Sequence, residues 1–276
     1  MARDPTASTL SGVPFTFAHP AAAVPLARVL KRRGAFSALV IGSVAPDLAF
    51  VLPIGLKRFE SHDLAGLLWF CLPVGLLGYL WFHTLARTPL LWLMPESIRS
   101  RVEPGPSRRF GLPDISWLWV AVSLLLGSLS HIAWDSLTHR GGFLVESFEV
   151  MRRPLAQPWG WNFAPYKILQ YVSGVAGLLL LALWYRRWVR RTPARPAPAQ
   201  PFASLWRRAI WMIGIASIVV GSAIRAIPHK RPSAPWSVWI PITAPRVAIA
   251  FVGSSVVAAV LYSIAWRIAH RRRDPL

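Results

Sequence analysis

Cysteine and acidic residues are both scarce in this chain. Its 276 residues include a single cysteine, Cys71, so no disulfide can form within the chain and cysteine usage does not reveal a redox compartment. Asp and Glu number 11 against 31 Lys and Arg, and charged residues make up only 15% of the sequence. Soluble domains carry about 25% charged residues, so this composition argues against a soluble protein. The N-terminal region has no uninterrupted apolar stretch followed by a cleavage site, and we therefore expect no removable signal peptide.

Long apolar runs are abundant instead. Hydrophobic residues make up 54% of the chain, and five runs approach the length of about 20 residues that a helix needs to cross a bilayer. The runs cover residues 64–85, 116–138, 168–189, 209–227 and 246–266. Many of the 15 tryptophans lie near the ends of these runs, which is typical of the aromatic belts at membrane interfaces. The sequence therefore predicts an all-α, polytopic integral membrane helix bundle with five full spans.

The net charge of +20 resides in the loops between the apolar runs and at the C-terminus. We interpret it as topogenic charge that also contacts anionic membrane lipids, and we expect no nucleic-acid partner because no DNA- or RNA-binding motif accompanies it. One set of loops holds about two-fold more Lys and Arg than the other, and the positive-inside rule places the richer set in the cytoplasm. This richer set comprises the tip at 31–33, the loop at 86–114, the linker at 186–208 and the C-terminus. The sequence does not indicate an oligomeric state.

Composition divides the chain into four parts. Residues 1–13 are polar and patternless, and we expect a disordered extension there. Residues 14–190 form a membrane helical domain that holds most of the histidines. Residues 191–205 are a linker rich in proline and alanine, and residues 206–276 form a membrane hairpin of two helices with a basic tail.

Two short helical patterns, one starting at His19 and one ending before Asp47, precede the first full span. A helix of about 12 residues rises only about 18 Å, so neither pattern crosses a bilayer alone. A helical hairpin that turns at Arg33-Gly34 would bring His19 and Asp47 to the same level. A sixth span over residues 34–54 would instead place His19 on the opposite side. Both arrangements fit the sequence, and the hairpin is the one that we favour. Ser61 is the expected N-cap of the span at 64–85.

The central span ends in the most informative stretch of the chain, residues 127–139. His131, Asp135 and His139 are spaced at i, i+4 and i+8, and a turn of about 100° per residue puts them on one helix face. A carboxylate and imidazoles on an apolar helix are costly unless they are paired, hydrated or bound to a metal. A hydrogen-bonded pair of His131 and Asp135 that joins helices is the simplest alternative to a metal site. His139 precedes Arg-Gly-Gly, and we predict that it is a loop residue.

Most of the histidines lie at span ends on one expected side of the membrane. Neutral imidazole and carboxylate groups are the ligands that zinc, manganese and ferrous iron prefer. We take zinc as the first choice of divalent metal, with manganese or iron as alternatives. For each single residue, a capping, turn or interfacial role is the alternative to ligation. The candidate metal ligands are His19, Asp47, His62, His131 and Asp135, with His131 and Asp135 at the catalytic centre.

Five motifs occur in order within residues 13–190. They are Phe15-Thr-Phe-Ala-His19-Pro20, Ser37-Ala-Leu-Val-Ile-Gly-Ser-Val-Ala-Pro-Asp47, Ser61-His62, Gly127-Ser-Leu-Ser-His131-Ile-Ala-Trp-Asp135-Ser-Leu-Thr-His139 and Pro165-Tyr166-Lys167-Ile-Leu-Gln170. Together they resemble a bacterial membrane family known as domain of unknown function 4184, with the last two spans at its variable end. This resemblance implies a location in the bacterial inner membrane.

The order His, Pro-Asp, Ser-His and Ser-His-x-x-x-Asp is also similar, more distantly, to membrane-bound metal-dependent hydrolases. The pattern of that distant family resembles the His and Asp ligands of zinc-dependent phospholipase C. The resemblance implies metal ligation by the same five residues named above. The chain has one Asp47 where the distant family often has an Asp-x-Asp-His cluster, so the number of metal ions stays open.

Three functions fit these observations. The first is an integral membrane metal-dependent hydrolase that acts on a phospholipid-like or other phosphoester at the membrane interface. The second is a structural or scaffolding membrane protein with a polar or metal-bound core. The third is a proton or cation transporter, since intramembrane His and Asp also mark ion pathways. A transporter would need polar residues along the whole membrane depth, whereas the candidate ligands gather at one end.

Overall fold

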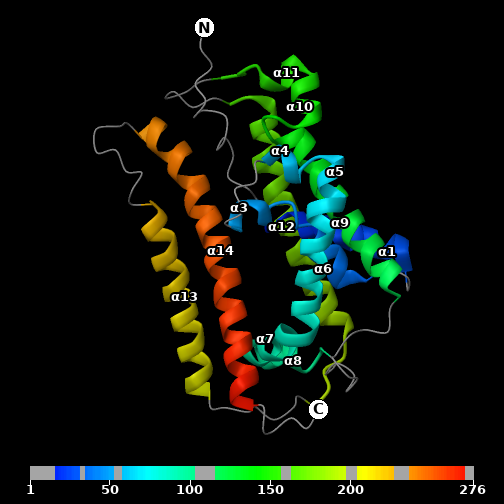
Figure 1. Ribbon diagram of the computed structural model, residues 1–276, viewed down its shortest axis with the longest axis vertical. Helices are drawn as coiled ribbons and strands as arrows, with labels where there is room; N and C mark the ends of the chain where they lie inside the picture. The colour runs from blue at the N-terminus through cyan, green and yellow to red at the C-terminus, as the bar shows by residue number, and fades with distance from the viewer. Residues whose placement is uncertain are drawn as a thin grey trace.

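The structure is a computed structural model that describes residues 16–31, 35–52, 58–102, 116–156, 163–196, 204–226 and 236–270. Regular structure in these residues is helical, apart from one isolated β-bridge between Ala156 and Phe163 (Figure 1). Five helices are long and apolar enough to cross a membrane: Leu64–Leu93, Trp117–Ser147, Pro165–Arg191, Leu205–Ile224 and Thr243–His270. They match the five apolar runs, so the predicted all-α polytopic fold is confirmed. The expected extension at 1–13 and part of the 191–205 linker lie outside the described residues.

Short helices form the N-terminal part of the bundle. They are η1 (His19–Ala22), α1 (Ala23–Leu30), α2 (Phe36–Gly42) and α3 (Leu48–Val51). α1 packs against α2, and the Thr16 hydroxyl donates a hydrogen bond to Asp47 from the other end of this segment. Because α2 ends at Gly42 and α3 begins at Leu48, the described residues 35–52 are not one continuous helix and do not form the sixth span. The chain has the two short, packed helices of the hairpin alternative. The predicted turn at Arg33-Gly34 is outside the described residues.

Helix α2 lies against the central helix α9 (Trp117–Thr138). Glycine allows this contact, because a Cβ atom on Gly42 would overlap the backbone of Leu124, and one on Gly127 would overlap the carbonyl of Leu39. The Ser128 hydroxyl adds a hydrogen bond of 3.0 Å to the Gly42 carbonyl. The close approach fixes the height of α2 along α9, and thereby the position of the turn that carries Asp47.

The first long span is a chain of helical segments: α5 (Leu64–Gly66), η3 (Leu67–Cys71), α6 (Leu72–Trp81), η4 (Phe82–Ala86) and α7 (Arg87–Leu93). The short helices α4 (Arg58–Ser61) and α8 (Glu96–Arg99) precede and follow it. The expected N-cap was wrong. Asp63, the residue directly before α5, accepts the hydrogen bond from the Gly66 amide, whereas Ser61 closes the preceding turn α4. The Ser61 hydroxyl instead lies 2.8 Å from Nδ1 of the neighbouring His62.

The remaining elements cover the bundle on one end and one side. α10 (Phe143–Ser147) and α11 (Glu149–Arg152) lie beyond the end of α9, next to the start of α12 (Pro165–Arg191), as Figure 1 shows. The helices α13 (Ser204–Ala226) and α14 (Trp236–His270) form the predicted C-terminal hairpin, in which α14 contacts α3, η4 and α7.

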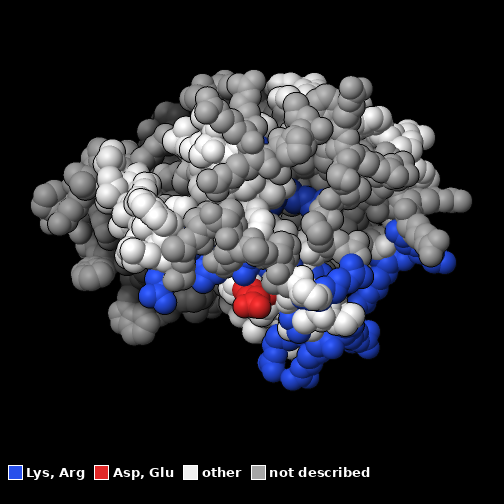
Figure 2. Space-filling view, turned by 90° about the horizontal axis from the view of Figure 1, so that it is seen from below, with Lys and Arg blue, Asp and Glu red and all other residues white. Residues whose placement is uncertain are grey.

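Lys and Arg gather at one end of the bundle (Figure 2). α7 and α8 lie at the lower end in Figure 1, and the basic C-terminal turn of α12 joins them there through hydrogen bonds from Arg101 to the carbonyls of Val189 and Thr192. Seen from this end, Lys and Arg gather at the rim of the molecule (Figure 2). α4, α5, α10 and α11 lie at the opposite end. The cytoplasmic location of the segments richer in Lys and Arg stays a prediction.

Candidate metal centre

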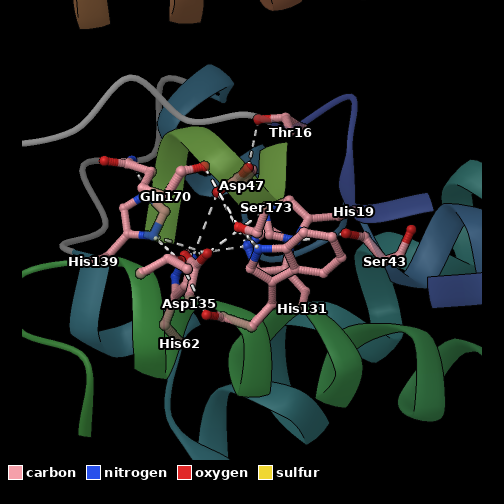
Figure 3. A network of polar contacts seen from close by, with 12 residues as sticks. Thr16, His19, Ser43, Asp47, His62, His131, Asp135, His139, Gln170 and Ser173 are labelled. Carbon is pink, nitrogen blue, oxygen red and sulfur yellow. Dashed lines mark hydrogen bonds and ion pairs between the residues drawn. The ribbon is translucent and has the colours of Figure 1, made fainter. Parts of the chain in front are cut away.

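The five predicted ligands converge from separate parts of the chain. His19 begins η1, Asp47 precedes α3, His62 lies between α4 and α5, and His131 and Asp135 project from α9 (Figure 3). All five side chains are nearly excluded from solvent, with exposed fractions of 8% or less. Burying two carboxylates among three imidazoles is costly without compensation, so the site needs a charge partner.

Four of the five residues form a compact group of donor atoms. Asp47, His62, His131 and Asp135 each offer one ligand atom, and these atoms all lie within 4.8 Å of one another. The Nε2 atom of His62 is 3.5 Å from Asp47 Oδ1 and 3.6 Å from Asp135 Oδ2. The Nε2 atom of His131 is 3.5 Å from each of the same two oxygens. Each imidazole therefore faces both carboxylates at nearly the same distance.

These distances fit ligation better than direct ion pairs. A charge-assisted hydrogen bond between nitrogen and carboxylate oxygen is about 2.7–2.9 Å long, well short of the four separations here. Ligand atoms bound tetrahedrally at about 2.0–2.2 Å from zinc lie about 3.3–3.6 Å from one another. The four separations of 3.5–3.6 Å fall in that range. The donor atoms are thus spaced as they would be around one small divalent cation.

Helix α2 sets the orientation of His131. Its Nδ1 lies 2.8 Å from the Ser43 carbonyl oxygen, just after the end of α2. A carbonyl can only accept, so Nδ1 carries the proton, and in a neutral ring Nε2 presents its lone pair to the group. A metal-binding histidine commonly donates its second N–H in this way. The close α2–α9 packing at Gly42 and Gly127 is what brings the carbonyl within reach.

Hydroxyl groups orient two further members. The Thr16 hydroxyl donates to Asp47 Oδ2 over 2.6 Å and leaves Oδ1 facing the group. Ser61 Oγ lies 2.8 Å from His62 Nδ1 and directs Nε2 inward. Burial alone would raise the pKa of Asp47, but the charge that the adjacent His131 carries when it is protonated outweighs burial and holds that pKa well below its usual range. Asp47 is therefore a carboxylate, the form that binds cations.

His19 lies beside the four-atom group. Its ring stacks on His131 with centroids 3.8 Å apart, and its Nε2 is 3.5 Å from Asp135 Oδ1, the oxygen that points away from the group. Burial, together with the nearby His131, lowers the pKa of His19 to about 3, so the ring is neutral. Its buried Nδ1 has no hydrogen-bond partner among the described residues. Of the five predicted ligands, four therefore belong to the donor group, whereas His19 lies next to the other oxygen of Asp135.

A family model described as a domain of unknown function, DUF4184, matches residues 13–264. The chain belongs to the DUF4184 family. The match continues past residue 190 into α14, so the two C-terminal helices that were expected at the variable end are covered by the family model. No curated protein and no solved structure matches the chain. The comparisons therefore do not bear on the distant resemblance to metal-dependent hydrolases.

Two residues of the DUF4184 site were not predicted as part of it. His139 directly follows α9 in extended backbone, so it is the loop residue that was expected, yet it is 6% exposed and its Nδ1 lies 3.0 Å from Asp135 Oδ1. Its position four residues after Asp135 was the signal in the sequence. Gln170 of α12 lies 2.8 Å from His139 Nε2 and is also buried. Gln170 closes the last of the five motifs, but its distance from Asp135 along the chain gave no indication of contact.

Proposed function

We propose that this DUF4184 protein binds one divalent cation, with zinc as the first choice, through Asp47, His62, His131 and Asp135. The observation that carries the proposal is the equal spacing of two imidazole nitrogens from two carboxylate oxygens, at 3.5–3.6 Å. Three of the four residues also have a hydrogen-bond partner that turns the donor atom inward, which is usual around bound metals. A cation would compensate the two buried carboxylates.

We propose further that the bound cation serves hydrolysis. Structural zinc sites are usually built from thiolates, whereas His and Asp sets are common where a metal activates water. The only cysteine, Cys71, is buried and does not belong to the donor group. A cation held here would polarise a phosphoester and lower the pKa of a bound water. His131 and Asp135 are the residues to which we assign the catalytic centre.

The position of the site suggests a substrate at the membrane interface. His62 lies just before the span Leu64–Leu93, and Asp135 lies three residues before the end of α9. Both places are near helix ends and so near headgroup depth. A phospholipid-like phosphoester, whose phosphate lies at this depth, is the substrate class that we propose.

A structural cation is the second candidate. Four protein donors form a closed set, which is typical of sites that stabilise a fold, whereas catalytic zinc usually keeps one position for water. Such an ion would join the turn before α3, the turn before α5 and helix α9.

Hydrolysis separates these candidates. The detergent-purified protein would be stripped with a chelator, reloaded with Zn²⁺ or Mn²⁺, and assayed on a soluble phosphomonoester, a soluble phosphodiester and phospholipid vesicles, beside Asp135→Asn. An enzyme releases product only when loaded, and Asp135→Asn lowers the rate by at least about 100-fold. If the wild type binds the cation and gains thermal stability but hydrolyses none of these substrates, the structural role replaces the catalytic one.

A further inference from the structure

Helix α12 reaches the candidate metal centre through two buried side chains. Gln170 Nε2 lies 2.8 Å from His139 Nε2, and His139 Nδ1 lies 3.0 Å from Asp135 Oδ1. The exposed fractions of Gln170, His139 and Asp135 are 4%, 6% and 5%. The three groups therefore form a continuous chain of contacts that ends on a member of the donor group (Figure 3).

The protons in this chain have defined positions. The Gln170 amide nitrogen can only donate, so His139 Nε2 accepts and Nδ1 carries the ring proton. Thr138 supports the same assignment, because its hydroxyl proton goes to the Trp134 carbonyl and its oxygen, 3.0 Å from Nδ1, is left to accept. The N–H of His139 Nδ1 therefore goes to Thr138, and the same nitrogen is in ion-pair contact with Asp135 Oδ1 at 3.0 Å.

The two oxygens of Asp135 then have different tasks. Oδ1 is in ion-pair contact with His139 Nδ1 at 3.0 Å, and Oδ2 lies 3.5 Å from His131 Nε2 and 3.6 Å from His62 Nε2, within the donor group. A carboxylate held at one oxygen cannot rotate freely, so its other oxygen stays directed at the cation. Hydrogen-bonded partners of this kind commonly change metal affinity by about 10–100-fold.

We propose that Gln170 and His139 are positioning residues that fix the ring tautomer of His139 and, through it, direct Asp135 Oδ2 toward the cation. This proposal rests on the cation site proposed above. It assigns α12 a role at the site, although α12 supplies none of the four donor atoms. The chain of contacts also explains why a glutamine and a histidine are buried together at the end of α9.

The same two helices provide a matched control. One turn after Gln170, the Ser173 hydroxyl accepts a hydrogen bond of 3.0 Å from Trp134 Nε1. This contact also joins α12 to α9 but does not lead to Asp135. A substitution at Ser173 therefore tests the general effect of losing one hydrogen bond between these helices.

The test is the affinity for Zn²⁺ alone, measured by competition with a chelating dye on the full-length protein in detergent. Gln170→Met, which keeps the length but removes the donor, should weaken binding by about 10–100-fold, and His139→Ala should do the same. His139→Asn keeps an N–H near the position of Nδ1 and should bind within about 3-fold of the wild type. Ser173→Ala should bind like the wild type.

A double variant makes the test specific for the tautomer. An asparagine side chain has no tautomer for a partner to set, so Gln170→Met should have no further effect in the His139→Asn background. The thermal unfolding of the cation-free proteins is measured on the same samples. Unchanged Zn²⁺ affinity in Gln170→Met, or equal losses from it in both backgrounds, would overturn the positioning role while leaving the cation site intact. A wild type that binds no Zn²⁺ would overturn both proposals.

Discussion

Two buried histidines, His131 and His83, are each anchored at one ring nitrogen but differ in what the second ring nitrogen faces. Both lie on membrane-spanning helices, and each has one ring nitrogen next to an oxygen of the α2 region. His131 contacts the Ser43 carbonyl at 2.8 Å, and His83 Nε2 contacts the Ser37 hydroxyl at 2.9 Å. The other nitrogen of His131 faces the carboxylates of Asp47 and Asp135.

The surroundings of His83 are apolar. Its ring packs against the rings of Tyr79 and Phe82, and its buried Nδ1 has no hydrogen-bond partner among the described residues. The comparison shows that burial and one anchoring hydrogen bond do not make a histidine a ligand. A histidine becomes a candidate ligand when further donor atoms lie around its second nitrogen. At His131 these are the carboxylates of Asp47, from the turn after α2, and Asp135, from α9.

The largest expected effect comes from the close contact between α2 and α9, because the α2 region carries the hydrogen-bond partners of both histidines. Gly127→Ala would place a Cβ against the Leu39 carbonyl and force α2 away from α9. Overpacking costs about 1–3 kcal/mol where side chains can yield, and we expect the upper end or more here because backbone is in the way. Thermal unfolding in detergent measures the loss. Gly214→Ala on α13, where a Cβ meets nothing within 4 Å, is the control and should be as stable as the wild type. Equal stability of the two variants would contradict the close packing.

The next prediction concerns Zn²⁺ affinity, and it tests whether Asp47 binds the cation directly or acts only through its charge. Asp47→Asn should reduce Zn²⁺ affinity by more than about 100-fold, because a neutral amide replaces a buried anionic donor. Asp63→Asn removes the same charge directly after His62, but Asp63 caps α5 and asparagine caps equally well, so affinity and stability should be unchanged. Isothermal titration or dye competition gives both affinities. Similar values for the two variants would mean that Asp47 acts only through long-range charge.

The smallest effect concerns the other histidine. Ser37→Ala leaves His83 Nε2 buried without its hydroxyl partner and should lower the free energy of unfolding by about 1–2 kcal/mol, with no change in metal content. Ser130→Ala removes only a local bond to the Gly127 carbonyl on the same helix and should cost less. Loss of bound metal in Ser37→Ala would show that the two histidines belong to one system and would break the comparison.

Much of the fold follows from the sequence because membrane spans depend on length and hydropathy alone. The helical period also places His131 and Asp135 on one face, and the short length of the N-terminal helices already favoured a meeting of His19 and Asp47. The hairpin alternative could be chosen only with the structure, since the two arrangements differ in tertiary contacts and not in local pattern.

Other features of the site depend on contacts that leave no local pattern. The Ser43 carbonyl that orients His131 is a backbone group, and backbone groups carry no residue identity. Thr16 and Gln170 reach the site from distant segments. The cap at α5 was misassigned because Ser61 and Asp63 are both good capping residues, and the place where the helix begins decides between them.

Metal content tests the central claim most directly. The detergent-purified wild type, analysed by mass spectrometry for zinc, manganese and iron, should contain about one such ion per chain, as expected for one four-donor site. The double variant His131→Ala/Asp135→Ala should lose the ion, whereas His83→Ala should retain it. A wild-type protein that contains no metal, and that takes up none after incubation with Zn²⁺, Mn²⁺ or Fe²⁺, would contradict the account and leave a buried network of ion pairs in place of a metal centre.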